Sequence, residues 1–474
     1  MKKQRDMSVD AKLGFSEHFG YFLGSGVNVQ QALFGTFLLV YYTNVAGINA
    51  GLAATVIAIS KVLDGISDLV MGYLVDHTKS KLGKARPWLL RMMAPTVICA
   101  VLAFFVPATW GRTAQIIYMF ITYNLANTVC YTALAVPYSS LCGLATMNQK
   151  SRGINGGLNS LGTNVLFTIL VNSFFLKISG AIGGGELYTQ KGFIGAVIVY
   201  MIIYVIATGI CVALTRERVS INKGDNEQVD NTVKDNHGNT VGIGRILKSL
   251  FTNKYWLLSC ATGTLIMFLM GTTGSATVYY TQYVLGNVSL QALLSAVYSL
   301  SMIPTLVLGI ALIGKLGKRN CLMIGMGTSA IGFLLPLIST ATPVLIAGML
   351  LKGFGFGFGG ASMNSIVQDA ITYGMWKNGF NPVGMGNAAI TFAFKIGQGL
   401  GTATLGAILS LGNFDASLAV QSKSAITSIN SIYIVIPAII SALCVFCMSR
   451  YDLDKKYSAI EADLKEGKYA SDKE

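Results

Sequence analysis

Three charged residues stand at helical spacing inside an otherwise apolar segment. Lys61, Asp64 and Asp68 follow one another at intervals of three and four residues, so a helix would place them on one face. A carboxylate in the hydrocarbon region of a membrane costs at least roughly 2.5 kcal/mol, and such residues are usually functional. Because carboxylate oxygens are hard ligands, Asp64 and Asp68 predict a binding site for a small hard cation.

Two alternatives stay open for this group of charges. In the first, Lys61 forms a structural ion pair with Asp64, and Asp68 pairs with a neighbouring helix. In the second, the bound cation is a proton, because two close carboxylates can share one. The residues therefore predict a cation site without deciding between Na⁺ and H⁺.

The composition indicates that lipid surrounds most of the chain. It is 53% hydrophobic and only 12% charged, with a mean hydropathy of +0.57, whereas soluble domains average about 25% charged residues. A membrane-spanning helix needs about 20 apolar residues, and we predict about twelve such spans. Their approximate bounds are 20–42, 51–75, 88–109, 114–141, 156–179, 192–214, 256–282, 291–313, 321–341, 343–371, 386–411 and 427–449.

The net charge of +14 is distributed unevenly. Basic residues gather before the first predicted span and after the even-numbered spans, whereas the alternate loops are nearly bare. This positive-inside distribution predicts a multi-pass protein of the cytoplasmic (inner) membrane with both termini in the cytoplasm. It does not predict a nucleic-acid partner. The densest group follows the second span and consists of Lys79, Lys81, Lys84 and Arg86.

The predicted spans fall into two sets of six. Residues 1–215 and 256–449 hold one set each, residues 216–255 form a polar cytoplasmic linker, and residues 450–474 form an amphipathic cytoplasmic tail. The sequence Lys-Leu-Gly-Lys occurs at 81–84 and again at 315–318, after the second span of each set. We therefore predict an all-α polytopic membrane protein with the twelve-helix major-facilitator fold, built from two six-helix halves around a midplane site.

Further polar residues interrupt the predicted spans. Lys395 lies near the middle of span eleven and needs a counter-charge, for which Asp64 or Asp68 are the natural candidates. Lys395 and Lys61 would then couple occupancy of the cation site to the central cavity. The alternative is a polar face of span eleven that contacts another helix.

Hydroxyl and amide groups in several spans suit a sugar ligand, with tyrosine as a stacking surface. Hydrogen bonds between helices are the alternative for each of them. Lys352 would contact a substrate carboxylate or form an interior salt bridge. The predicted substrate-binding residues are Asn28, Tyr131, Ser139, Asn364, Lys352 and Gln398.

Three charges near cytoplasmic helix ends predict a gate that opens and closes during transport: Asp76, Arg86 and Asp369. Solvated charges at helix ends are the alternative interpretation. No Ser/His/Asp set, metal cluster or phosphate loop stands out, so we do not expect an enzyme. All eight cysteines lie in or near predicted spans and there are three histidines, so no cofactor is expected besides a coupling cation.

Several short motifs carry a family resemblance. They are Asp64-Gly-Ile-Ser-Asp68, Gly72-Tyr-Leu-Val-Asp76 with the basic run to Trp88, Tyr41-Tyr-Thr43, Val136-Pro-Tyr138, Asp369-Ala-Ile-Thr-Tyr-Gly374 and Lys395. The chain resembles the glycoside–pentoside–hexuronide:cation symporters over its whole length.

The resemblance implies that Asp64 and Asp68 ligate the cation, with Thr132 nearby and Lys395 at the same site. At the sugar site the chain departs from the family, because Asn28 and Ala135 stand where a known member has sugar-binding aspartates. The implied function is import of a glycoside or related sugar with Na⁺ or H⁺ by alternating access. The expected partners are a small sugar and membrane lipid, and a monomer is compatible with the sequence. An uncoupled sugar facilitator, or a lipid or sensor function on the same scaffold, is the alternative.

Overall fold

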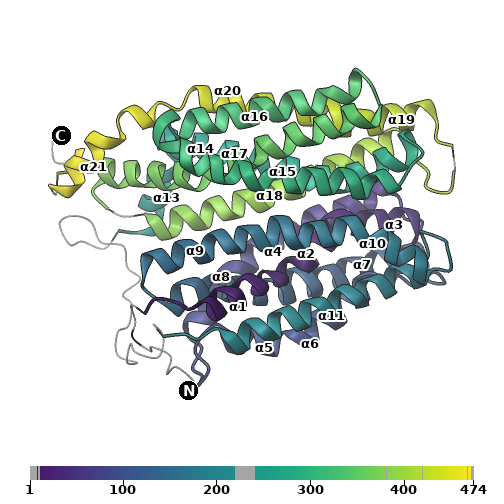
Figure 1. Cartoon of the computed structure of the whole chain (residues 1–474), viewed down its shortest axis with the longest axis horizontal. Coiled ribbons are helices and arrows are strands. Elements are labelled where there is room, and N and C mark those ends of the chain that lie inside the picture. Colours follow the sequence, from purple (N-terminus) through teal and green to yellow (C-terminus); the bar gives the residue numbers. More distant parts are fainter. Residues whose placement is uncertain are drawn as a thin grey trace. The chain divides into compact units, whose positions relative to one another are not determined.

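The computed structural model describes residues 8, 11–218, 241–380, 382–418, 420–466 and 468–470. Its regular elements are helices, labelled along the chain in Figure 1. Each of the twelve predicted spans coincides with one helix or with consecutive helical segments. Most of the predicted linker, residues 219–240, lies outside the described residues.

The first six predicted spans are formed by helical segments that are in several places joined end to end. They are α1 (Phe15–Gly24), η1 (Ser25–Asn28), α2 (Val29–Leu33), η2 (Phe34–Leu38), α3 (Leu39–Asn44), α4 (Ala50–Asp76), α5 (Arg86–Arg91), α6 (Met93–Ala103), α7 (Arg112–Tyr123), η3 (Asn124–Tyr131), α8 (Thr132–Ala145), α9 (Gln149–Leu161), η4 (Gly162–Phe167), α10 (Thr168–Ile182) and α11 (Gln190–Leu214), with η1 as a short 3₁₀ turn between α1 and α2.

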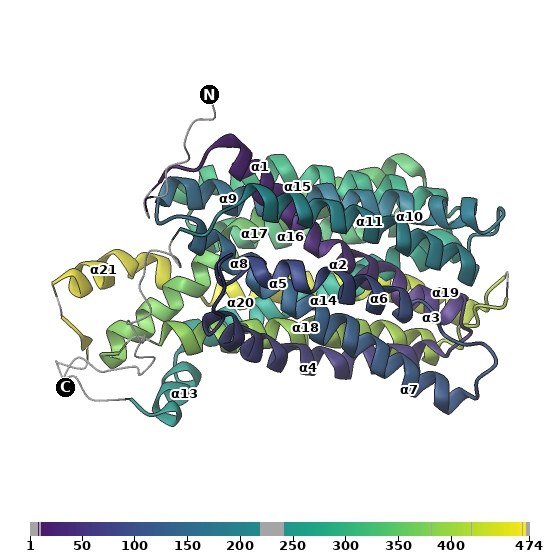
Figure 2. The same cartoon turned by 90° about the horizontal axis from the view of Figure 1, so that it is seen from below.

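The rest of the chain repeats this pattern of long and joined helices. Its elements are α13 (Ile243–Phe251), α14 (Lys254–Tyr279), η5 (Tyr280–Val284), α15 (Ser289–Leu316), α16 (Lys318–Leu334), η6 (Leu335–Leu337), α17 (Thr342–Asn378), α18 (Val383–Leu411), α19 (Lys423–Asn430), η7 (Ser431–Val435), α20 (Ile436–Ser449), η8 (Leu453–Lys455) and α21 (Tyr457–Lys465). A short helix, α13, precedes span seven, and the predicted amphipathic tail contains α21. Figures 1 and 2 place both near the same end of their unit.

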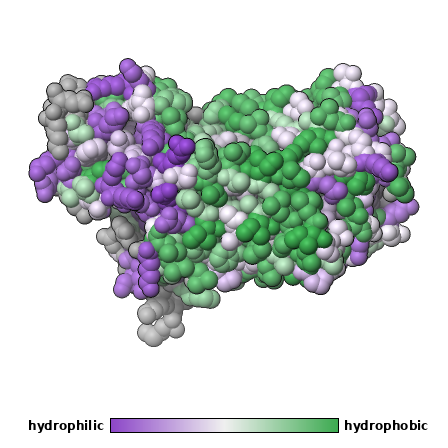
Figure 3. Space-filling model, turned by 90° about the horizontal axis from the view of Figure 1, so that it is seen from above, coloured by the Kyte–Doolittle hydropathy of each residue, from purple (hydrophilic) through white to green (hydrophobic). Residues whose placement is uncertain are grey.

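The helices have the length and surface of membrane-crossing segments. Eight helices or joined helices in the described residues are long and apolar enough to span a bilayer, and two shorter helices are also apolar. Large apolar side chains such as Ile59, Ile66 and Ile206 are exposed on them. On the face drawn in Figure 3, apolar residues form a broad band between hydrophilic regions. Such a surface requires lipid, because soluble proteins rarely expose apolar patches of this extent.

The chain folds into two compact units. Unit 1 comprises Met1–Gln228, Thr277–Ala296 and Gly406–Ile426, and unit 2 comprises Val229–Ala276, Val297–Leu405 and Thr427–Glu474. Unit 1 therefore holds the first six spans together with two short segments from later in the chain. The site below lies within unit 1.

The repeated Lys-Leu-Gly-Lys sequence has a glycine with positive φ beside a carboxylate in both units, although residues 81–84 lie in a loop and residues 315–318 join α15 directly to α16. In unit 1, Gly83 has φ +102° and the Glu217 carboxylate accepts hydrogen bonds from the three backbone N–H groups of residues 84–86, at 2.7–3.0 Å. In unit 2, Gly317 has φ +81° and the Asp454 carboxylate accepts from the N–H of Arg319 at 3.0 Å. A carboxylate from after the last span of each half therefore caps the helix that follows this turn.

Candidate functional site

The buried carboxylate of Asp64 is surrounded by donors. Asp64 lies on α4 and is 1% exposed. From η3, the Asn127 amide donates to its Oδ2 and the Thr128 hydroxyl donates to its Oδ1. Lys61 lies one turn earlier on α4, with its Nζ 3.4 Å from Asp64 Oδ2. The carboxylate therefore contacts one cationic side chain and two neutral donors.

The second carboxylate, Asp68, lies one turn further along α4 and is partly exposed. Thr132 at the start of α8 donates to Asp68 Oδ1 at 3.3 Å. The Ser67 hydroxyl lies 3.1 Å from Thr132 Oγ1 and donates to the Asp64 backbone carbonyl at 2.9 Å. The three predicted cation ligands, Asp64, Asp68 and Thr132, thus lie close together where α4 packs against η3 and α8.

The local sequence explains why so many polar groups face α4 here. Segment η3 is a π-helix over Asn124–Tyr131, and wide π-helical turns are frequent at functional sites. Asn124 at its start donates to Ser60 Oγ at 2.8 Å and accepts from Thr128 at 3.0 Å. Since α4 packs against both η3 and α8, these side chains form one hydrogen-bonded network around the carboxylates.

A second polar chain begins at Tyr131, the last residue of η3. The Tyr131 hydroxyl donates to Asn28 Oδ1 at 2.8 Å, and Asn28 donates to Thr163 Oγ1 at 2.9 Å. Thr163 in turn donates to Asn159 at 3.2 Å. The structure therefore brings together two of the predicted substrate residues, Asn28 and Tyr131. Sequence reasoning missed Asn159 and Thr163, although their spacing of four residues in span five is a usable signal.

Among the other predicted substrate residues, Ser139 is the one that belongs to unit 1. The side chain of Ser139 is exposed, and its hydroxyl donates to the Val136 carbonyl of its own helix at 2.8 Å. Asn364 and Gln398 belong to unit 2, as does the predicted coupling residue Lys395. The pairing of Lys395 with Asp64 or Asp68 stays a prediction.

Lys352 is enclosed by aromatic rings in unit 2. Its side chain is 1% exposed, and its Nζ lies 4.4 Å from the centre of the Phe333 ring and 4.3 Å from that of the Tyr433 ring. Cation–π contacts of this kind stabilise an ammonium group away from water. Among the residues that the structure describes, no carboxylate forms an ion pair with Lys352. The roles predicted for Lys352, in a salt bridge or in contact with a substrate carboxylate, stay predictions.

Two of the predicted gate residues, Arg86 and Asp369, are bonded within their own units. Arg86 is buried in unit 1, and its guanidinium donates to the Val212 carbonyl at 2.7 Å. In unit 2, Asp369 pairs with Lys318 at 2.5 Å. Asp76 is the last residue of α4, and its side chain lies outside what the structure describes. A gating role for these three residues stays a prediction.

The model of one protein family matches most of the chain. The family is described as MFS/sugar transport protein, and the match covers residues 20–455. The chain belongs to this family. It is therefore an integral multi-pass membrane transporter of the major facilitator type, and the family is one of transporters rather than enzymes.

Named relatives of this transporter agree with the family. An isoprimeverose transporter of Lactiplantibacillus pentosus is 27% identical over 95% of this chain and 91% of its own length. A glucuronide carrier protein homolog of Escherichia coli (strain K12) is 26% identical over 96% of each chain. These matches confirm the resemblance to the glycoside–pentoside–hexuronide:cation symporters.

A solved structure supports the fold. The D-xylose-proton symporter matches with a TM-score of 0.65 at 14% identity, over 94% of this chain and 99% of that one. At this identity the likeness shows the fold alone, which confirms the predicted major-facilitator class.

Unit 1 of the transporter also contains a hydrogen-bonded group that sequence reasoning missed. Thr43 Oγ1 lies 2.7 Å from the Tyr279 hydroxyl, Asn44 donates to the Tyr283 hydroxyl at 2.9 Å, and Tyr188 donates to Gln282 at 2.5 Å. These residues border loops that carry few basic residues, on the side opposite the predicted cytoplasmic face. We call them the outer cluster, and its members are Thr43, Asn44, Tyr188, Tyr279, Gln282 and Tyr283.

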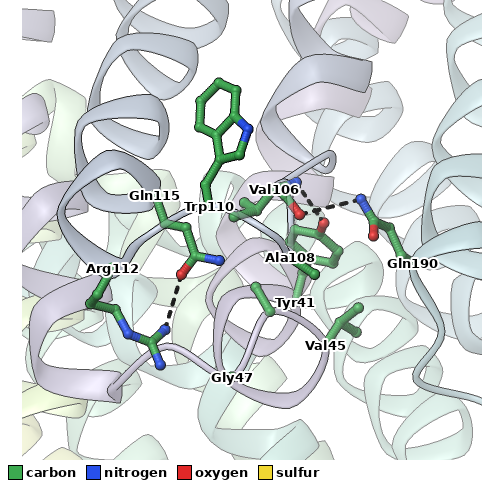
Figure 4. Close-up of a pocket in the computed structure, with 10 residues that line it drawn as sticks. Tyr41, Val45, Gly47, Val106, Ala108, Trp110, Arg112, Gln115 and Gln190 are labelled. Carbon is green, nitrogen blue, oxygen red and sulfur yellow. Dashed lines mark hydrogen bonds between the residues drawn. The ribbon is translucent and has the colours of Figure 1, made fainter.

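A recess of about 390 Å³ lies in unit 1 beside the loop that follows α3, at residues 45–47 (Figure 4). Arg112 donates to Gln115 at 3.2 Å, and Gln190 donates to the Val106 carbonyl at 3.4 Å. The Trp110 ring points away from these side chains in Figure 4. The polar groups of the recess bond largely to one another, so we assign no ligand to it.

Proposed function

We propose that this transporter imports a sugar or glycoside across the cytoplasmic membrane by symport with Na⁺ or H⁺. The observation that carries the proposal is the buried carboxylate of Asp64, compensated by Lys61 and followed one turn later by Asp68. A charge pair in the membrane interior is expensive and is retained mainly where it functions. A cation that binds these carboxylates competes with the Lys61 ammonium, and this competition can link cation binding to a conformational change.

The substrate class follows from two observations. The chain of Tyr131, Asn28, Thr163 and Asn159 next to the carboxylates offers hydroxyl and amide groups, which match the hydroxyls of a sugar. The named relatives carry isoprimeverose in one case and are described as a glucuronide carrier homolog in the other. We therefore propose that this chain of residues contacts substrate hydroxyls.

Alternating access is the mechanism that we propose for transport. The outer cluster joins Thr43 and Asn44 of the first span to residues of the seventh predicted span, at the end of α14 and in η5, and so would have to break before a substrate enters from outside. Lys395 is our proposed counter-charge for the carboxylates in one of the alternating states. The basic loops support a cytoplasmic position for both termini.

The deciding experiment is uptake into proteoliposomes from a panel of radiolabelled glycosides, pentosides and hexuronides. Each sugar is run with an inward Na⁺ gradient, an inward H⁺ gradient or no gradient. We expect accumulation against the sugar gradient with one cation. Flux without accumulation would establish the uncoupled facilitator, and no flux of any sugar would favour a different substrate on this scaffold.

Variants then test the role of the carboxylate. Asp64→Asn should abolish uphill accumulation while sparing exchange or downhill flux, because the negative charge that attracts the cation is lost but the sugar contacts remain. The control is Asp415→Asn, which changes an exposed loop carboxylate that bonds to Ser417. Unimpaired accumulation in Asp64→Asn would refute the proposed cation site.

A further inference from the structure

One buried oxygen beside the carboxylates stands out. Asn127 is 1% exposed, and its amide nitrogen donates to Asp64 Oδ2. Its side-chain oxygen, Oδ1, is buried and accepts no hydrogen bond within the described part of the chain. Buried carbonyl oxygens are almost always paired, and an exception commonly marks the position of a water or an ion.

The asparagine side chain can present either of two atoms to Asp64. Its nitrogen and oxygen are nearly identical in size, and rotation about the last side-chain bond exchanges them. When its nitrogen faces Asp64, the Asn127 amide donates to the carboxylate, as the structure shows. When its oxygen faces Asp64, the amide becomes a ligand for a cation bound to the same carboxylate, because carboxylate and carboxamide oxygens together suit hard metal ions.

We infer that Asn127 is a direct ligand of the coupling cation, together with Asp64, and that this cation is Na⁺. The inference rests on the proposed symport and adds a ligand from span four to it. A neutral amide oxygen takes up no proton near neutral pH but adds affinity for a metal ion. A site that includes it therefore favours Na⁺ over H⁺.

The same geometry describes how Na⁺ binding changes the site. As Na⁺ approaches Asp64, the Asn127 amide rotates and its oxygen gains a partner. The Lys61 ammonium, 3.4 Å from Asp64 Oδ2, loses part of its attraction to the carboxylate. Thr128 keeps its contact with Oδ1, so the carboxylate does not have to move.

The test uses the full-length protein and NaCl as the ligand. Thermal unfolding of the purified protein without sugar gives the Na⁺ concentration for half-maximal stabilisation, with choline chloride holding ionic strength constant. Na⁺-dependent sugar uptake in proteoliposomes at equal internal and external pH gives a second value. For Asn127→Leu, which keeps the size but removes the oxygen, we expect both concentrations to rise about tenfold, equivalent to about 1.4 kcal/mol.

Two further variants make the result specific. Asn155→Leu is the matched control. Like Asn127, Asn155 is a buried asparagine with one side-chain atom that has no hydrogen-bond partner in the described part of the chain. In Asn155 that atom is the amide nitrogen, which cannot bind a cation. Asn155→Leu should leave the Na⁺ dependence unchanged. Asn127→Asp keeps an oxygen ligand and should retain the Na⁺ response, which covers the case in which Asn127→Leu does not fold.

The outcomes separate this inference from the proposed function. An unchanged Na⁺ dependence in Asn127→Leu, or a folded Asn127→Asp without a Na⁺ response, would overturn the role of Asn127. Accumulation driven by H⁺ alone would overturn the assignment of Na⁺ while leaving symport intact. Absence of accumulation under every gradient would refute symport itself and the inference with it.

Discussion

The ammonium of Lys61 lies 3.4 Å from the Asp64 carboxylate, and the two residues are 6% and 1% exposed. Taking both charges out of water costs free energy that their attraction repays only in part. Removing a single partner leaves a buried charge without this ion-pair contact, whereas removing both charges does not. This asymmetry makes the pair testable independently of transport.

We expect Lys61→Met to destabilise the protein by about 3–5 kcal/mol, since Asp64 would stay buried without its counter-ion. The double variant Lys61→Met/Asp64→Asn should recover most of this loss. The measurement is thermal or denaturant unfolding of the purified protein in detergent, analysed as a double-mutant cycle. Additive effects of the two substitutions would show that the pair contributes no coupling energy.

The two Lys-Leu-Gly-Lys turns should differ in their tolerance of alanine. At Gly83 a Cβ would lie 2.4 Å from the Glu217 carboxylate at φ +102°, whereas at Gly317 it would lie 3.0 Å from Asp454 at φ +81°. Both changes add the strain of a left-handed backbone, about 1–2 kcal/mol.

Gly83→Ala should therefore lower the melting temperature more than Gly317→Ala, because it also displaces the carboxylate that caps residues 84–86. Gly72→Ala is the control, since Gly72 lies in α4 with nothing within 4 Å of an added Cβ. It should be neutral or slightly stabilising. Equal losses at Gly83 and Gly317 would contradict the capping role assigned to Glu217.

Breaking one bond of the outer cluster should loosen the segments around it. Tyr283→Phe removes the hydroxyl that accepts from Asn44 at 2.9 Å. Loss of one such bond costs about 1 kcal/mol, which corresponds to roughly fivefold faster amide exchange where local opening limits exchange. The measurement is hydrogen–deuterium exchange of peptides covering residues 39–48 and 279–288.

The control for this experiment is Tyr118→Phe, which removes a hydroxyl that donates to the Leu102 carbonyl elsewhere in unit 1. Its exchange in the same two peptides should match that of the unmodified protein. Peptides that exchange equally slowly in Tyr283→Phe would show that the cluster does not restrain these segments.

Lys352→Met tests whether the enclosed lysine recognises an anionic substrate. The rings of Phe333 and Tyr433 cover its ammonium, so we expect the ratio of hexuronide to neutral glycoside uptake to stay unchanged. Methionine fills a similar volume and contacts aromatic rings favourably, so the melting temperature should be unchanged or higher. Selective loss of hexuronide uptake would instead establish Lys352 as a substrate contact.

The sequence by itself determined the parts of this protein that depend on local pattern. Hydropathy located the helical segments, because a span must present apolar side chains to lipid over its whole length. The spacing of Lys61, Asp64 and Asp68 was enough to place them on one face of α4, since helical periodicity alone decides which side chains share a face. The Lys-Leu-Gly-Lys sequences likewise predicted a structural repeat between two halves of the chain.

The tertiary structure decided which groups complete the site. Asn127 is one polar residue among many in its span, and only the packing of η3 on α4 distinguishes it. The spacing of Thr163 and Asn159 places them on one face of span five, but only the chain of bonds from Tyr131 shows what that face contacts. For Lys352 the sequence predicted either a salt bridge or a substrate carboxylate, and only the structure shows that the rings of Phe333 and Tyr433 contact its ammonium group. Hydrogen-bond partners from distant spans depend on helix rotation and on wide turns such as η3, and no periodicity in a single sequence encodes them.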